Sequence, residues 1–144
     1  MVNFREICTE AYFDPNTDTL VIGLDLLSDA QQSAVVLAHE GMHAIWRADY
    51  DEYLAGVPDR PQYGTPPNPP GGVRSSNSID QEYAAFLTNL QVYYDLKKYH
   101  GMPSVSRWDS ILSKFLNSTT GIPLASDSEA KIYLRSIYTS LSEY

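Results

Sequence analysis

The most informative stretch of the chain runs from Ala34 to Trp46 and reads AVVLAHEGMHAIW. It is apolar on nearly every side of a helix, whereas a surface helix carries one apolar stripe and one polar face. The residues before it supply a helix start, because Ser28 and Gln31 have the spacing of a capping box. We therefore expect a helix over residues 29–49 that lies buried at the centre of the fold.

This stretch contains two histidines four residues apart, in the sequence HEGMH of residues 39–43. Histidines at this spacing lie about 40° apart around a helix and one turn apart along it, so both imidazole rings can reach one ion. Zinc accepts such a pair of nitrogen ligands. Glu40 lies about 100° from His39, where it can contact a water next to the ion. The pattern predicts that His39 and His43 bind a metal, against the alternative of two core histidines satisfied by hydrogen bonds.

A catalytic zinc ion needs a third protein ligand and an open position for water. A second helix is expected from Ser78 to about His100, because Ser78 and Gln81 repeat the capping-box spacing and Gly101 follows as a stop. Glu82 lies in the first turn of this helix. We therefore take Glu82 as the candidate third ligand.

The residues around Glu82 are compatible with that role. Ala84 and Ala85 are small and would let this helix approach the histidine helix closely. The alternative is that an acidic residue in a first turn only complements the helix dipole, a function that Asp80 could also serve. His100, at the far end of the same helix, is expected to be a helix-terminal charge rather than a ligand.

The remaining segments predict an α+β fold in one domain over residues 1–144. Residues 10–24 read as a β-hairpin, with aromatic and β-branched residues flanking a turn sequence. Two C-terminal helices are expected over 105–117 and 127–142. The small hairpin would pack on the buried histidine helix, followed by the ligand helix and the two C-terminal helices. The last helix would face the core with Ala130, Leu134, Ile137 and Leu141.

Residues 51–77 are rich in proline and glycine, so we expect an irregular loop there. Loops of this length in a compact domain are usually functional or disordered. Two interpretations stay open at this point, a passive surface excursion and a rim over a cleft.

Composition excludes several classes of function. The net charge of -8 repels nucleic-acid phosphates and anionic lipid surfaces. The single cysteine, Cys8, cannot form an intramolecular disulfide. The longest apolar run, residues 34–38, is far too short to span a bilayer, and Arg5 and Glu6 interrupt any secretory signal. We expect neither nucleic acid nor membrane as a partner and, by default, a cytoplasmic protein, with export by another route and the oligomeric state left open.

With His39, Glu40 and His43 in H-E-x-x-H and Glu82 on a following helix, residues 10–100 resemble the zincin metallopeptidases, in particular the gluzincin-like branch. The resemblance implies a zinc-dependent hydrolase that cleaves peptide or protein substrates, with the two histidines and Glu82 as Zn²⁺ ligands and Glu40 as general base. It also implies that the strand over 19–24 pairs with an extended substrate.

One position departs from the family pattern. Thermolysin-type members carry an aspartate four residues after the ligand glutamate, whereas this chain has Phe86 there. The chain is therefore most similar to the small, minimal members. A donor for the developing oxyanion is also expected. The residues open to that role are Tyr50, Tyr53, Tyr63, Arg74 and Tyr93.

Three alternatives to the gluzincin-like interpretation remain. A metzincin would use Asp49 as third ligand, but Trp46 stands where that pattern has the glycine at which the helix turns. A peptide deformylase would use an upstream cysteine in a Glu-Gly-Cys segment, and the segment around Cys8 differs from it. Outside the enzymes, the same metal could stabilise a non-catalytic module that binds a protein partner.

Overall fold

The computed structural model describes residues 11–14, 17, 19–23, 28–54, 78–139 and 141, and for residues 46–54 it describes the backbone alone. Over these residues the chain is a small α+β fold with a two-stranded antiparallel sheet and four helices, which confirms the expected class. The elements in order are β1 (Ala11–Asp14), β2 (Thr19–Ile22), α1 (Ala30–Leu54), α2 (Ile79–His100), α3 (Ser106–Phe115) and α4 (Ser128–Ile137).

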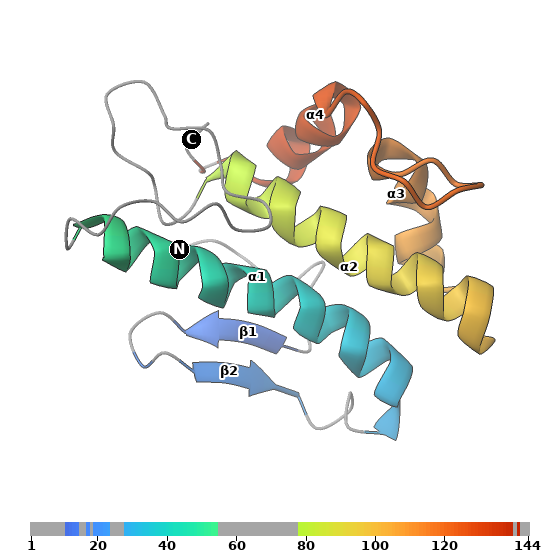
Figure 1. Ribbon diagram of the computed structural model, residues 1–144, viewed down its shortest axis with the longest axis horizontal. Coiled ribbons are helices and arrows are strands. Elements are labelled where there is room, and N and C mark those ends of the chain that lie inside the picture. The colour runs from blue at the N-terminus through green and yellow to red at the C-terminus, as the bar shows by residue number, and fades with distance from the viewer. Residues whose placement is uncertain are drawn as a thin grey trace.

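The predicted hairpin is present, and β1 is its inner strand. The two strands pair in register from Ala11 opposite Ile22 to Asp14 opposite Thr19. Figure 1 shows β1 next to α1, with β2 on the far side of β1. Ala11 is buried, whereas Leu20 on β2 is partly exposed. The strand expected to pair with a substrate, over 19–24, therefore includes β2, the strand more distant from α1.

Helix α1 differs from the expectation at both ends. Its N-cap is Asp29 rather than Ser28, because the Asp29 Oδ1 atom accepts hydrogen bonds from the backbone N–H groups of Gln31 and Gln32, each at 3.0 Å. The helix then continues to Leu54 instead of ending near residue 49. Residues 51–54 of the expected loop are therefore helical, and residues 55–77 lie outside the described part of the chain.

The central helix is α2 and not α1, contrary to the expectation from sequence. On α1, Ala34 is exposed and Ile45 is 44% exposed. By contrast, α2 contacts α1 on one side and α3 and α4 on the other (Figure 1). Its Phe86, Leu90 and Tyr93 are fully buried as a result. Although α1 and α2 are long, no helix in the described ranges combines the length and apolarity that a membrane span requires.

The two C-terminal helices form where they were expected, but both are shorter. Ala130 and Leu134 of α4 are fully buried, as predicted. Ile137 is 37% exposed, which contradicts its predicted core position, because α4 ends there instead of continuing to residue 142. Tyr138 follows as the C-cap residue and turns back into the core.

Helix α2 is tied to α3 and α4 by polar contacts. The Tyr93 hydroxyl donates a hydrogen bond to Asp109 at 2.7 Å and accepts one from the Val105 backbone N–H at 2.8 Å. The Lys131 ammonium on α4 lies 2.7 Å from an Asp80 oxygen at the start of α2. These contacts fix both ends of α2 against the C-terminal helices.

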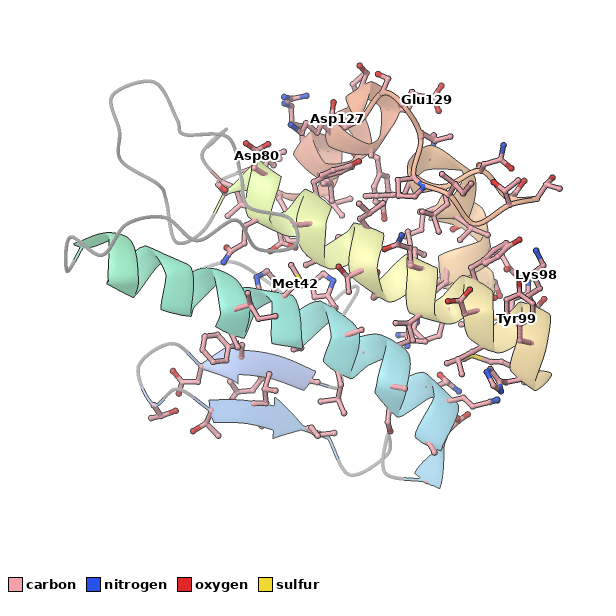
Figure 2. All side chains as sticks on the ribbon, in the orientation of Figure 1. Met42, Asp80, Lys98, Tyr99, Asp127 and Glu129 are labelled. Carbon is pink, nitrogen blue, oxygen red and sulfur yellow. The ribbon has the colours of Figure 1, made fainter. Side chains whose placement is uncertain are left out.

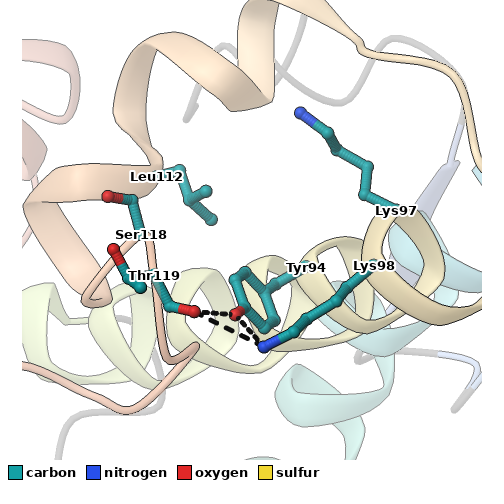
Figure 3. Close-up of a pocket in the computed structure, with 6 residues that line it drawn as sticks. All are labelled: Tyr94, Lys97, Lys98, Leu112, Ser118 and Thr119. Atoms are coloured by element: carbon teal, nitrogen blue, oxygen red, sulfur yellow. Dashed lines mark hydrogen bonds between the residues drawn. The ribbon is translucent and has the colours of Figure 1, made fainter.

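A hollow of about 330 Å³ lies between the C-terminal end of α2 and the segment after α3 (Figure 3). Its polar groups bond to one another: the Tyr94 hydroxyl donates to the Thr119 carbonyl, and Lys98 donates to the Tyr94 hydroxyl at 2.8 Å. Lys97 is paired with Asp109 at 2.7 Å. Both lysines that line the hollow, Lys97 and Lys98, therefore already bind groups of this chain.

Two glycines with left-handed backbone allow a test of this packing. Gly121 has φ 71°, and a Cβ atom built there would lie 2.4 Å from a Tyr94 ring carbon. Gly101 has φ 68° with no atom near such a Cβ. Gly101→Ala should therefore cost only the left-handed strain of about 1–2 kcal/mol. Gly121→Ala should cost that strain plus an overpacking penalty of about 1–3 kcal/mol.

Urea unfolding of both variants measures the difference in free energy of unfolding. Equal losses for Gly101→Ala and Gly121→Ala would contradict the close packing of the 117–121 turn on Tyr94.

Candidate metal centre

Three side chains predicted to bind a metal meet at the interface of α1 and α2. His39 and His43 lie one turn apart on α1, and their Nε2 atoms are 3.2 Å apart. The Glu82 carboxylate on α2 faces both, with Oε1 3.4 Å from the His43 Nε2 and Oε2 3.6 Å from the His39 Nε2. One ligand atom from each residue can be chosen so that all lie within 4.8 Å of one another.

The close approach of the two helices depends on small residues, as expected. Met42, next to His43 on α1, packs against Ala84 and Ala85 of α2 in a small apolar cluster. Figure 2 shows Met42 in the space between the two helices. Because the two helices lie close together, the Glu82 carboxylate on α2 can approach His39 and His43 on α1.

All three side chains are buried, and burial controls their charge. It lowers the pKa of His39, with the Glu40 charge opposing the change. It lowers the pKa of His43 to about 4, against the attraction of Glu82. It raises the pKa of Glu82, with His43 and the Tyr138 hydroxyl opposing. Both histidines are therefore neutral at neutral pH, the form in which imidazole binds a metal.

The arrangement fits a bound cation better than it fits a closed hydrogen-bond network. Within the described residues, neither Glu82 oxygen accepts a hydrogen bond of ordinary geometry, although both are buried. Buried polar atoms are normally satisfied by a partner, so their convergence here is unusual. Two imidazole nitrogens and one carboxylate are the donor set of a three-ligand zinc site with one open position.

The residues behind the ligands differ for the two histidines. Burial lowers the pKa of His43, and the Gln81 side chain is among the groups that oppose this change. His39 instead packs edge-on against the Phe86 ring, with centroids 4.8 Å apart. The His39 Nδ1 atom has no hydrogen-bond partner in the described part of the chain. In this chain an aromatic ring, and not a polar group, therefore lies against His39.

Glu40 is buried beside the group but belongs to a different contact. Its Oε2 accepts a hydrogen bond from the Phe13 backbone N–H on β1, at 3.0 Å. This bond joins the hairpin to α1 next to His39. Glu40 is not a member of the three-residue group that can hold the ion. The carboxylate is therefore separate from the ligand set and held by a neutral donor.

The other residues singled out from sequence do not join the His39–His43–Glu82 group within the described part of the chain. The Tyr93 hydroxyl is engaged with Asp109 and the Val105 backbone N–H, on the side of α2 that faces α3. His100 ends α2, as expected. Asp49 lies on a helix that continues unbroken to Leu54, so its backbone is displaced from the histidine face by about 100°. The structure does not describe the side chains of Tyr50 and Tyr53, and Cys8, Tyr63 and Arg74 lie outside the described residues.

Sequence reasoning missed the Phe13 backbone N–H, which donates to Glu40, and the opposition of Gln81 and Tyr138 to the pKa shifts of His43 and Glu82. Gln81 was recognised only for its capping spacing, although it also precedes the ligand Glu82. A backbone donor and a side chain from the end of α4 leave no local signal in sequence. No family model, no curated protein and no solved structure matches the chain. The case for function therefore rests on the residues and their geometry.

The histidine pair gives the first test of the site. His39→Ala and His43→Ala should lose zinc, and they should lose the rise in melting temperature that zinc produces, because a metal bound only by the folded state stabilises it. The measurements are metal content and melting with and without added zinc. His100→Ala is the matched control and should keep both properties. Undiminished zinc content in the two variants would show that the pair is merely packed in the core.

Proposed function

We propose that the chain is a zinc-dependent peptidase of the zincin type, with a gluzincin-like ligand set. The observation that carries the proposal is a buried His-His-Glu group with a second, separate carboxylate, Glu40, next to it. His39, His43 and Glu82 would hold the ion. A purely structural zinc site is usually closed by four ligands and often rich in cysteine, and this group offers three ligands and no cysteine.

The chain's own residues would divide the work of peptide hydrolysis. When bound, zinc supplies Lewis-acid chemistry: it makes water a better nucleophile and polarises a carbonyl oxygen. Glu40 would accept a proton from the attacking water and return it to the leaving amine. The Phe13 N–H would orient the Glu40 carboxylate, since it donates a hydrogen bond to Oε2. The apolar contacts of Phe86 and Met42 would limit water around the ligands.

A non-catalytic module stabilised by metal is the second candidate. It is favoured by the burial of His39 and Glu82, both of which have no exposed surface. The two candidates differ in the need for Glu40, because a structural metal site does not require a base. Substitution of that residue therefore separates them.

Glu40→Gln should keep zinc but lower the rate of peptide hydrolysis by about 10²–10⁴-fold, since the base is lost and the ligands remain. The assay is digestion of a peptide library by the zinc-loaded protein, with a chelator-treated sample as blank. Hydrolysis by Glu40→Gln at the wild-type rate would contradict this mechanism. Zinc binding by the wild type with no hydrolysis of any peptide would favour the structural module.

The third ligand can be tested separately from hydrolysis. Glu82→Ala should weaken zinc affinity by about 10-fold or more, because even the loss of a group behind a ligand has that effect. Asp49→Ala should leave affinity nearly unchanged, because the unbroken helix places residue 49 about 9 Å along its axis from His43. The measurement is a competition titration against a chromophoric chelator. The reverse order of affinities would favour the metzincin-type ligand set.

A further inference from the structure

We propose that the hollow at the C-terminal end of α2 is a second binding site, which takes a carboxylate attached to an apolar group. Its volume of about 330 Å³ lies in the lower part of the range of small-molecule sites. Tyr94 in its wall follows Glu82 on the same helix by about 18 Å along the axis. The hollow is therefore separate from the metal centre and does not depend on the proposed peptidase chemistry. The residues that line it are Tyr94, Lys97, Lys98, Leu112, Ser118 and Thr119 (Figure 3).

The hollow lies in a basic part of an acidic chain. Residues 96–126 contain four cationic side chains, Lys97, Lys98, Arg107 and Lys114, and a single acidic one, Asp109. The formal charge of this segment is therefore +3, in a chain whose net charge is -8. The C-terminal end of α2 and helix α3 lie at the same end of the molecule (Figure 1). Local positive charge raises the concentration of anions at that end.

The Lys98 ammonium is the charged group that a ligand can use. It lies 2.8 Å from the Tyr94 hydroxyl and 3.4 Å from the Thr119 carbonyl oxygen. It also lies 5.0 and 5.4 Å from the ring centroids of Tyr94 and Tyr99. All of these partners are neutral, and no carboxylate of the described residues pairs with Lys98. An ammonium has three N–H donors, so one remains for a ligand.

The charges around the hollow favour a ligand with one negative charge. Lys97 lines the hollow as well, but its ammonium is paired with Asp109 at 2.7 Å. Lys98 is therefore the one lining residue whose charge is not compensated. A carboxylate matches that single charge. A phosphate dianion would leave a negative charge unpaired near Asp109, which costs free energy when the ligand loses water.

Two hydroxyl groups and an apolar wall complete the site. The Ser118 and Thr119 hydroxyls make no hydrogen bond to the described residues, so both can donate to a carboxylate oxygen. Leu112 and the Tyr94 ring supply the apolar part of the lining. Small-molecule sites combine apolar walls with a few polar groups in this way. The apolar group of the ligand would lie against Leu112 and Tyr94 while its carboxylate faces Lys98.

The turn that carries the two hydroxyls is held in shape by the chain itself. The Asn117 Oδ1 atom accepts hydrogen bonds from the backbone N–H groups of Thr119 and Thr120, at 2.9 and 3.1 Å. Gly121, with φ 71°, brings the end of the turn against the Tyr94 ring. A site whose groups are ordered in advance loses less conformational entropy when a ligand binds.

The experiment titrates the full chain, labelled with ¹⁵N, with sodium hexanoate and separately with hexanol, and follows the backbone amide NMR shifts. Hexanoate should bind about 10-fold more tightly than hexanol, because only the carboxylate forms a charge-assisted hydrogen bond with Lys98. Its shifts should centre on residues 94–98 and 117–121. Lys98→Met should remove the advantage of hexanoate over hexanol. Lys114→Met removes the same charge outside the hollow and should change the affinity by less than about 2-fold.

Two peptides distinguish the sources of the carboxylate. A short peptide that ends in leucine is compared with the same peptide carrying a C-terminal amide. If the free peptide binds more tightly than both its amide and hexanoate, the ligand is a peptide C-terminus. If hexanoate binds at least as tightly as the free peptide, the ligand is a free carboxylic acid. Both results support the site.

Three results overturn the proposal: equal affinities for hexanoate and hexanol, unchanged hexanoate affinity in Lys98→Met, or shifts that centre on His39 and His43. The last of these would show that hexanoate binds at the metal centre instead. An absence of saturable shifts up to the solubility limit of hexanoate also overturns it. Melting curves check that both variants fold, and the hexanoate–hexanol comparison in the wild type decides the question if Lys98→Met does not. The metal-binding proposal is unaffected by any of these results.

Discussion

The structure depends on one buried contact, the Glu82 carboxylate of α2 set against the two neutral imidazoles of α1, at 3.4 and 3.6 Å. A carboxylate taken out of water loses on the order of several kcal/mol of hydration unless another charge or good hydrogen bonds replace it. Neutral histidines replace little of that loss, whereas a cation between the three groups replaces much of it. An ion held by this group would therefore stabilise the α1–α2 interface, so the proposed metal binding would be linked to folding.

The other elements act by holding this interface in place. The hairpin meets α1 through the Phe13 bond to Glu40, so the carboxylate next to His39 is held from outside the ligand set. Helices α3 and α4 cover the opposite side of α2 and bury Phe86 and Tyr93. The Lys131 contact with Asp80 attaches α4 at the turn of α2 that carries Glu82. The hairpin therefore holds the α1 side of the interface, and α3 and α4 hold the α2 side.

The support behind the ligands is uneven, and this unevenness has a chemical meaning. Burial lowers the pKa of His43 and raises that of Glu82, and Gln81 and Tyr138 respectively oppose these changes. His39 has the Phe86 ring instead, which restrains the imidazole by packing without fixing the position of its proton. An apolar contact keeps water away from the ligands, while a polar contact makes them stronger donors.

Much of the local structure was determined by sequence alone, because it depends on residues a few positions apart. The cap at Ser78, the stop at Gly101, the hairpin and the helical spacing of His39 and His43 all follow from local hydrogen bonds and the pitch of a helix. The meeting of Glu82 with the histidines was also predictable, since small residues beside it permit close helices. The pattern of burial could not be predicted from sequence. Helix α2 rather than α1 is central, and Ile137 is partly exposed, because burial depends on which faces the other elements cover. Only the tertiary structure could bring Phe13 to Glu40 and Tyr138 to Phe86, since those contacts join segments whose sequences carry no signal for each other.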